Sequence, residues 1–263
     1  MIVVDKLCYQ SNLRYVNPME KFVFSILTLI FCVVSRSIVM GIAVLMLNSI
    51  LTVKVGGISG KRYTKLMLIP LAFILIGTLA IIVNFSTYQL DAFAVPIGKW
   101  YMTGSWNGLL KGSQLIVTAL AAISCLYFLS LNTTMTDIIE INRKLHIPEL
   151  MIELMVLIYR YIFVLLDIAY SISTAQDARL GNRDYKTSMK SFGSMVQVLF
   201  IRSMKRARCL YDAMEARCYE GTIHVLSENR PMSKKNVIMI IIVELILLSY
   251  TLLIKIYGNG GML

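Results

Sequence analysis

The chain has 263 residues, of which 57% are hydrophobic and only 16% are charged, and its formal net charge is +11. Soluble domains carry about 25% charged residues, so this composition excludes an ordinary soluble protein and predicts one that spans a lipid bilayer. The positive charge suggests nucleic acid at first sight, but its placement around the apolar stretches is typical of membrane topology, and we expect no nucleic-acid partner.

Five apolar stretches predict transmembrane helices at residues 22–35, 37–53, 66–84, 113–131 and 237–254. Arg36 alone separates the first two. One helix over 22–53 would be about 48 Å long, whereas the hydrocarbon core is roughly 30 Å thick. We therefore expect two helices that turn at Ser35-Arg36-Ser37.

Basic residues indicate which side each loop faces. The segments 1–21, 54–65 and 132–236 hold 22 of the 26 lysines and arginines. Because basic loops stay in the cytoplasm, the N-terminus and the long section 132–236 are predicted to be cytoplasmic. The segment 85–112 is predicted to lie outside, where Trp100, Tyr101 and Trp106 suit an interfacial aromatic belt.

Residues 149–170 are apolar enough to suggest a sixth span, but charges interrupt them. Glu153, Arg160 and Asp167 recur every seven residues and so fall on one stripe of a helix. A charge in the middle of a bilayer costs about 2.5–3.5 kcal/mol. We therefore predict an amphipathic helix that begins near Ile147-Pro148-Glu149 and lies under the membrane.

These elements predict an all-α membrane protein with about five transmembrane helices and two or three long cytoplasmic helices. Residues 1–131 would hold the first four spans, residues 132–236 the cytoplasmic helices, and residues 237–263 the last span with an external tail.

Two short stretches in the cytoplasmic section resemble each other. Both read Ala-x-acidic-Ala-Arg, and their members are Ala175, Ala178 and Arg179 in the first and Ala213, Glu215, Ala216 and Arg217 in the second. Alanines three apart leave a small-residue surface that a partner can approach closely, and an arginine can bind a carboxylate with two bonds. On this pattern alone the repeat is consistent both with a functional motif and with chance in a helix rich in alanine and arginine.

Longer motifs carry a resemblance that covers nearly the whole chain. They are Val4-Asp5, Asn12-Leu13-Arg14, Asn17-Pro18-Met19-Glu20-Lys21, Tyr159-Arg160-Tyr161, Arg202-Ser203-Met204-Lys205-Arg206-Ala207 and Tyr211-Asp212-Ala213-Met214-Glu215-Ala216-Arg217. On these residues the chain resembles the transmembrane T component of energy-coupling factor transporters, in the cobalt/nickel branch.

The resemblance implies a coupling subunit without enzymatic activity or cofactor, in a bacterial cell membrane. It implies as partners two ATP-binding cassette ATPase subunits and a separate substrate-binding membrane subunit that carries cobalt or nickel. The family has two Ala-Arg-Gly motifs at the ends of its coupling helices, and by position these are Ala178-Arg179 and Ala216-Arg217. Leu180 and Cys218 stand where glycine is usual, and Gly181 follows one place late.

Other chemistry has little support in the sequence. There is no phosphate-binding loop of the Gly-x-x-x-x-Gly-Lys-Ser/Thr type, and the two histidines, His146 and His224, lie far apart in the chain, so neither ATP hydrolysis nor metal binding is expected here. Glu244 is a candidate functional carboxylate within a span. The alternatives are a permease subunit of an ordinary ABC importer and a membrane-embedded enzyme that uses Glu244, Asn84 and Asn48.

Overall fold

A computed structural model describes residues 3–82, 84–86, 93–97, 100–104, 106–219 and 230–258 of the chain. It divides into two compact units. Residues Ile2–Thr134 and Asn229–Leu263 form the spanning unit, and Met135–Glu228 form the second, which we call the α6–α8 unit.

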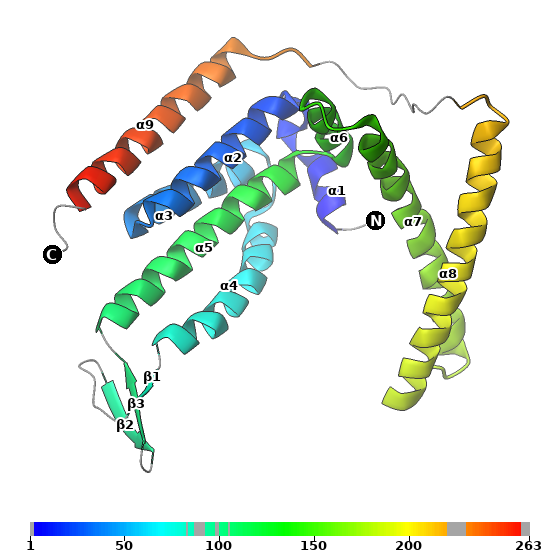
Figure 1. Cartoon of the computed structure of the whole chain (residues 1–263), viewed down its shortest axis with the longest axis horizontal. Helices are drawn as coiled ribbons and strands as arrows, with labels where there is room; N and C mark the ends of the chain where they lie inside the picture. The colour runs from blue at the N-terminus through cyan, green and yellow to red at the C-terminus, as the bar shows by residue number, and fades with distance from the viewer. Residues whose placement is uncertain are drawn as a thin grey trace. The chain divides into compact units, whose positions relative to one another are not determined.

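In the spanning unit, consecutive long helices run in opposite directions (Figure 1). Its helices are α1 (Val3–Gln10), η1 (Asn12–Tyr15), α2 (Pro18–Ser35), α3 (Ile38–Ile50) with its π-helical continuation η2 (Leu51–Val55), α4 (Gly60–Ile82), α5 (Trp106–Asn132) and α9 (Lys234–Gly258). Within the described residues, five helices are long and apolar enough to cross a membrane: Pro18–Ser35, Ile38–Val55, Gly60–Leu79, Gly108–Asn132 and Lys234–Leu253. The predicted set of five is confirmed.

The predicted turn between the first two spans is also confirmed. Asn17 caps the start of α2, where its side chain accepts a hydrogen bond from the backbone N–H of Met19, and Pro18 occupies the first helical position. At the other end Arg36 adopts a left-handed backbone with φ 45°, which stops α2 before α3 begins at Ile38.

A small antiparallel sheet connects α4 and α5, and the sequence analysis did not predict it (Figure 1). Its strands are β1 (Asn84–Ser86), β2 (Phe93–Ile97) and β3 (Trp100–Gly104), in the order β1-β3-β2. Of the three aromatic residues expected at an interface, Trp106 starts α5 with an exposed side chain, while the side chains of Trp100 and Tyr101 lie outside the described residues.

The core of the spanning unit lies along α5, which packs against α2, α3 and α4. Small side chains at this contact, Cys32, Ala121 and Cys125, are almost completely buried and let the helices approach closely. Val44 and Met40 fill the same cluster from α3. Close packing of this kind holds helices together where lipid provides no hydrophobic driving force between them.

A second set of contacts fixes the end of the spanning unit where α2 and α9 begin. The buried Lys21 donates from Nζ to the carbonyl oxygens of Leu13 at 3.1 Å and Asn132 at 2.7 Å, which ties α2 to η1 and to the end of α5. The buried Glu20 accepts from the backbone N–H of Ser233 at 2.9 Å and from Asn236 Nδ2 at 3.3 Å. The Asn17–Lys21 motif is therefore a structural anchor.

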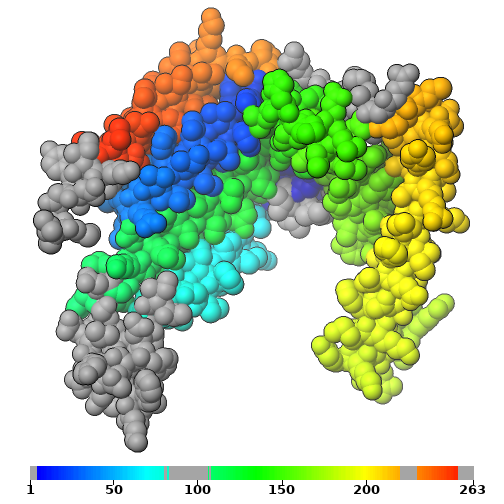
Figure 2. Space-filling model, viewed as in Figure 1, coloured from blue at the N-terminus to red at the C-terminus, as the bar shows by residue number. Residues whose placement is uncertain are grey.

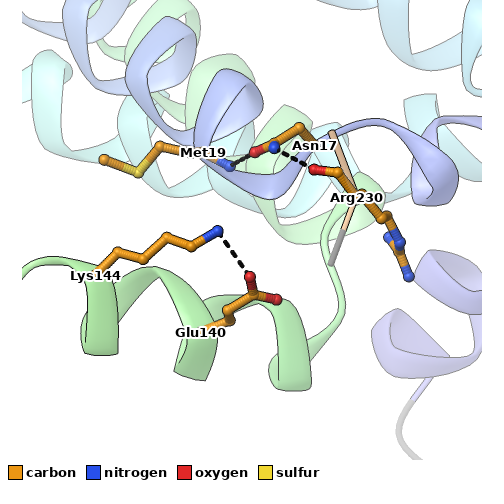
Figure 3. Close-up of polar contacts among 5 residues, drawn as sticks. All are labelled: Asn17, Met19, Glu140, Lys144 and Arg230. Carbon is orange, nitrogen blue, oxygen red and sulfur yellow. Dashed lines mark hydrogen bonds and ion pairs between the residues drawn. The ribbon is translucent and has the colours of Figure 1, made fainter. Parts of the chain in front are cut away.

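Asn17 contacts the segment before α9 as well. Its Nδ2 donates to the carbonyl oxygen of Arg230 at 2.7 Å, and Figure 3 shows this contact beside the bond to Met19. Arg230 in turn donates to the carbonyl oxygen of Arg14. The chain therefore enters α9 along a path set by residues near its N-terminus.

The α6–α8 unit consists of one short and two long helices: α6 (Met135–Lys144), α7 (Glu149–Ala178) and α8 (Tyr185–Glu215). Glu140 and Lys144 form an ion pair of 2.7 Å within α6 (Figure 3). α7 starts directly after Pro148, as predicted, and it is absent from the helices that qualify as spans in the described part of the chain. Its three spaced charges differ in exposure, because Glu153 is buried while Arg160 and Asp167 are exposed.

Candidate functional site

The first predicted motif lies where α7 ends. Ala175 and Ala178 occupy its last turn, and Arg179 is the C-cap residue. The backbone N–H of Arg179 donates to Gln176 O at 3.1 Å and that of Leu180 to Asp177 O at 3.0 Å. A third bond of 2.7 Å joins Gly181 N to Gln176 O and closes the helix end.

The second motif repeats this structure at the end of α8. Arg217 N donates to Met214 O at 3.0 Å, Cys218 N to Glu215 O at 3.0 Å, and Tyr219 N to Met214 O at 3.1 Å. These three bonds correspond, position by position, to the three bonds of the first motif. The resemblance between the two stretches is therefore one of backbone conformation as well as of sequence.

Leu180 and Cys218, which replace the expected glycines, adopt the backbone conformation that glycine favours. Their φ angles are 57° and 56°, both in the left-handed region. A side chain there costs about 1–2 kcal/mol. The two helix ends thus have the left-handed turn that glycine usually supplies, formed here by leucine and cysteine.

Gly181 has a separate role in the first motif. A Cβ atom at this position would lie 2.9 Å from Gln176 O and 2.9 Å from Ser191 Oγ, so a side chain would displace the turn. The same neighbours hold the turn together, because Gln176 Nε2 donates to Ser191 O and Ser191 Oγ donates to Gly181 O, both at 2.8 Å. Sequence reasoning missed Ser191, because nothing local indicates that it contacts a residue ten positions earlier.

The second motif is fixed by Tyr219, which the sequence analysis also missed. Its hydroxyl donates to the buried carboxylate of Glu153 in the second turn of α7. This hydrogen bond to Glu153 raises the pKa of Tyr219. A groove of about 490 Å³ runs beside this contact between α7 and α8, and it is lined largely by leucine, isoleucine and tyrosine side chains.

The side chains of both motifs are available to a partner. All seven predicted site residues are exposed: Ala175, Ala178, Arg179, Ala213, Glu215, Ala216 and Arg217. Neither Arg179 nor Arg217 forms an ion pair with any residue that the structure describes. No described residue of α8 is buried, and the face seen in Figure 2 leaves much of this helix uncovered. Large apolar side chains such as Phe192 and Phe200 are more than half exposed, at 56% and 64%.

The polar residues inside the spans make helix contacts. Glu244 Oε1 accepts a hydrogen bond of 2.8 Å from Thr28 Oγ1, and Asn48 Nδ2 donates to Ser124 Oγ at 3.3 Å. In the described part of the chain no three histidine, cysteine or acidic side chains are grouped so that they could hold a metal ion. Asn84 begins β1, and its side chain lies outside the described residues.

These features define a multi-pass membrane protein with a separate helical unit whose two long helices end in matching, exposed arginine motifs. Residues 10–228 match the CbiQ family, described as cobalt transport protein. The chain belongs to this family.

The chain is also similar to individual proteins along much of its length. The chain is 31% identical to an uncharacterized protein of Methanocaldococcus jannaschii, over 96% of this chain and 94% of the relative. It is 27% identical to the cobalt transport protein CbiQ of Salmonella typhimurium, over 86% of this chain and all of the relative. It is also 27% identical to the energy-coupling factor transporter transmembrane protein EcfT of Staphylococcus aureus, over 59% of this chain and 61% of the relative. The chain is thus a membrane component of an energy-coupling factor type transporter.

Proposed function

We propose that this chain is the coupling subunit of the transporter and transmits the movement of two ATPase subunits to a separate membrane subunit that holds the cargo. The observation that carries the proposal is the repeated helix end, in which Arg179 and Arg217 occupy the same backbone environment at the ends of two different helices. Two docking elements with the same backbone conformation would suit two ATPase subunits of the same fold. Each arginine would bind a carboxylate in a groove of one ATPase.

The mechanism follows from the stiffness of the two helices. α7 and α8 have 30 and 31 residues, and an arginine motif stands at one end of each. Closed helix ends such as these allow a force on the arginine to move the whole helix. The N-terminus and the α6–α8 unit would lie in the cytoplasm of a bacterial cell, where ATP is available. Cobalt or nickel ions would be bound by the partner membrane subunit.

Charge reversal of both arginines tests the proposal. The variant R179E/R217E is expressed together with the ATPases and the cargo-binding subunit, and the ATPases recovered with this chain are quantified. We expect recovery to fall at least tenfold, because each bidentate ion pair becomes a repulsive contact.

The matched control is K190E/R208E, which changes the net charge equally at exposed positions outside the motifs that form no ion pair with the described residues. It should retain the ATPases. Full recovery with R179E/R217E, or equal loss with the control, would contradict the assignment of the motifs.

A further inference from the structure

An apolar groove of about 430 Å³ opens in the spanning unit, beside the first turns of α2 and α9 and the last turns of α3 and η2. Sites that bind small molecules in proteins have about 300–1,000 Å³, so this volume is enough for a ligand. Two candidate spans form its facing walls, with Leu47, Leu51 and Val55 on one side and Met239, Ile240 and Val243 on the other.

The wall of the groove offers almost no polar group to an occupant. Its two charged lining residues are already engaged, since Glu20 accepts bonds from Ser233 and Asn236, and Lys21 donates to Leu13 and Asn132. The occupant must therefore be apolar along the wall. The residues from 47 to 55 give the wall a length of about 12 Å.

Two exposed lysines are sequence neighbours of lining residues, although neither lysine lines the groove itself. Lys54 precedes the lining residue Val55, and Lys235 precedes the lining residue Asn236. Both also lie at the ends of candidate spans, where a lipid headgroup region would begin. Lys234 is different, because a rotation of about 100° per residue places it on the opposite side of α9 from the lining face.

We propose that this groove binds one acyl chain of an anionic phospholipid, and that Lys54 and Lys235 bind its phosphate. The combination of an apolar wall within the bilayer and two cations at its headgroup end matches the two parts of such a lipid.

Native mass spectrometry of the full chain, titrated with phosphatidylglycerol or phosphatidylcholine, tests the headgroup contact. We expect one tightly retained phosphatidylglycerol and weaker retention of phosphatidylcholine. Each lysine near a headgroup contributes about fivefold in affinity, so K54Q/K235Q should weaken phosphatidylglycerol binding at least tenfold. The control K234Q removes a charge next to Lys235 and should change binding less than twofold. Equal retention of the two lipids, or equal effects of the two variants, would overturn the proposal.

A phosphatidylglycerol with a photoreactive group in its acyl chain tests the groove itself. In bilayer nanodiscs its crosslinks should concentrate on peptides that contain residues 47–55 and 236–243, and I240W should reduce them by filling the groove. Crosslinks spread evenly over all the spans would mean ordinary boundary lipid only. Loss of the crosslinks to these two peptides when the chain is assembled with its transporter partners would show that a protein occupies the groove. Either result would refute the lipid site.

Discussion

The spanning unit and the α6–α8 unit are both helical but differ in where their charged side chains lie. In the spanning unit, Glu20, Lys21 and Glu244 are buried, and each is hydrogen-bonded within the unit. In the α6–α8 unit most charges are exposed, and no described residue of α8 is buried. Lipid provides no hydrogen bonds, so a spanning helix must find its polar partners inside the protein. A helix whose apolar and charged surfaces are both uncovered has these surfaces available to bind another molecule.

The largest effect is expected from Lys21→Met, which tests whether the buried contacts stabilise the spanning unit. The substitution keeps most of the length of the side chain but leaves the carbonyl oxygens of Leu13 and Asn132 without their charged donor. Hydrogen bonds to a charged group contribute about 1.5–3 kcal/mol each, so we expect a loss of about 3 kcal/mol in stability. Thermal unfolding in detergent, followed by circular dichroism, measures it. Lys61→Met, at an exposed position, should have almost no effect.

An intermediate effect is expected from Gly181→Ala in the α6–α8 unit. The new Cβ would meet Gln176 O and Ser191 Oγ, and such overpacking costs about 1–3 kcal/mol. Gly193 provides a matched control within α8, because nothing lies within 4 Å of a Cβ added there. Gly193→Ala should stabilise α8 by about 1 kcal/mol. Hydrogen exchange at the α7–α8 turn distinguishes the two, and similar behaviour of both variants would show that the turn is not closely packed.

The smallest effect is expected from restoring glycine at the two helix ends. Leu180→Gly and Cys218→Gly each remove a side chain from a residue whose backbone is left-handed. Each should stabilise its helix end by up to about 1 kcal/mol, because the greater freedom of glycine in the unfolded chain offsets part of the gain. Slower hydrogen exchange in the last turns of α7 and α8 would reveal this. Leu180→Val should have the opposite effect and destabilise the end of α7, because a β-branched residue tolerates a positive φ less well. Faster exchange in the glycine variants would show that the side chains themselves hold the helix ends.

The sequence by itself determined the spans and the break between the first two. The backbone N–H and C=O groups of a long uncharged stretch must find hydrogen-bond partners within the stretch when it crosses a bilayer, and a helix provides them. A single helix from 22 to 53 would have been longer than the bilayer core is thick. The start of α7 after Pro148 was also predictable, because proline favours the beginning of a helix. The arginine motifs were visible as a repeat in the residues.

Only the tertiary structure decided how the motif residues are used. Asn17–Lys21 could be recognised as a motif, but its partners Asn132 and Ser233 lie far away along the chain, so its role as an anchor depends on how the helices pack. The conformations of Leu180 and Cys218 contradict their intrinsic preferences, and the contacts of Ser191 and Tyr219 cross between helices. Local propensity cannot indicate such features, because their energy comes from contacts that exist only once the chain is folded.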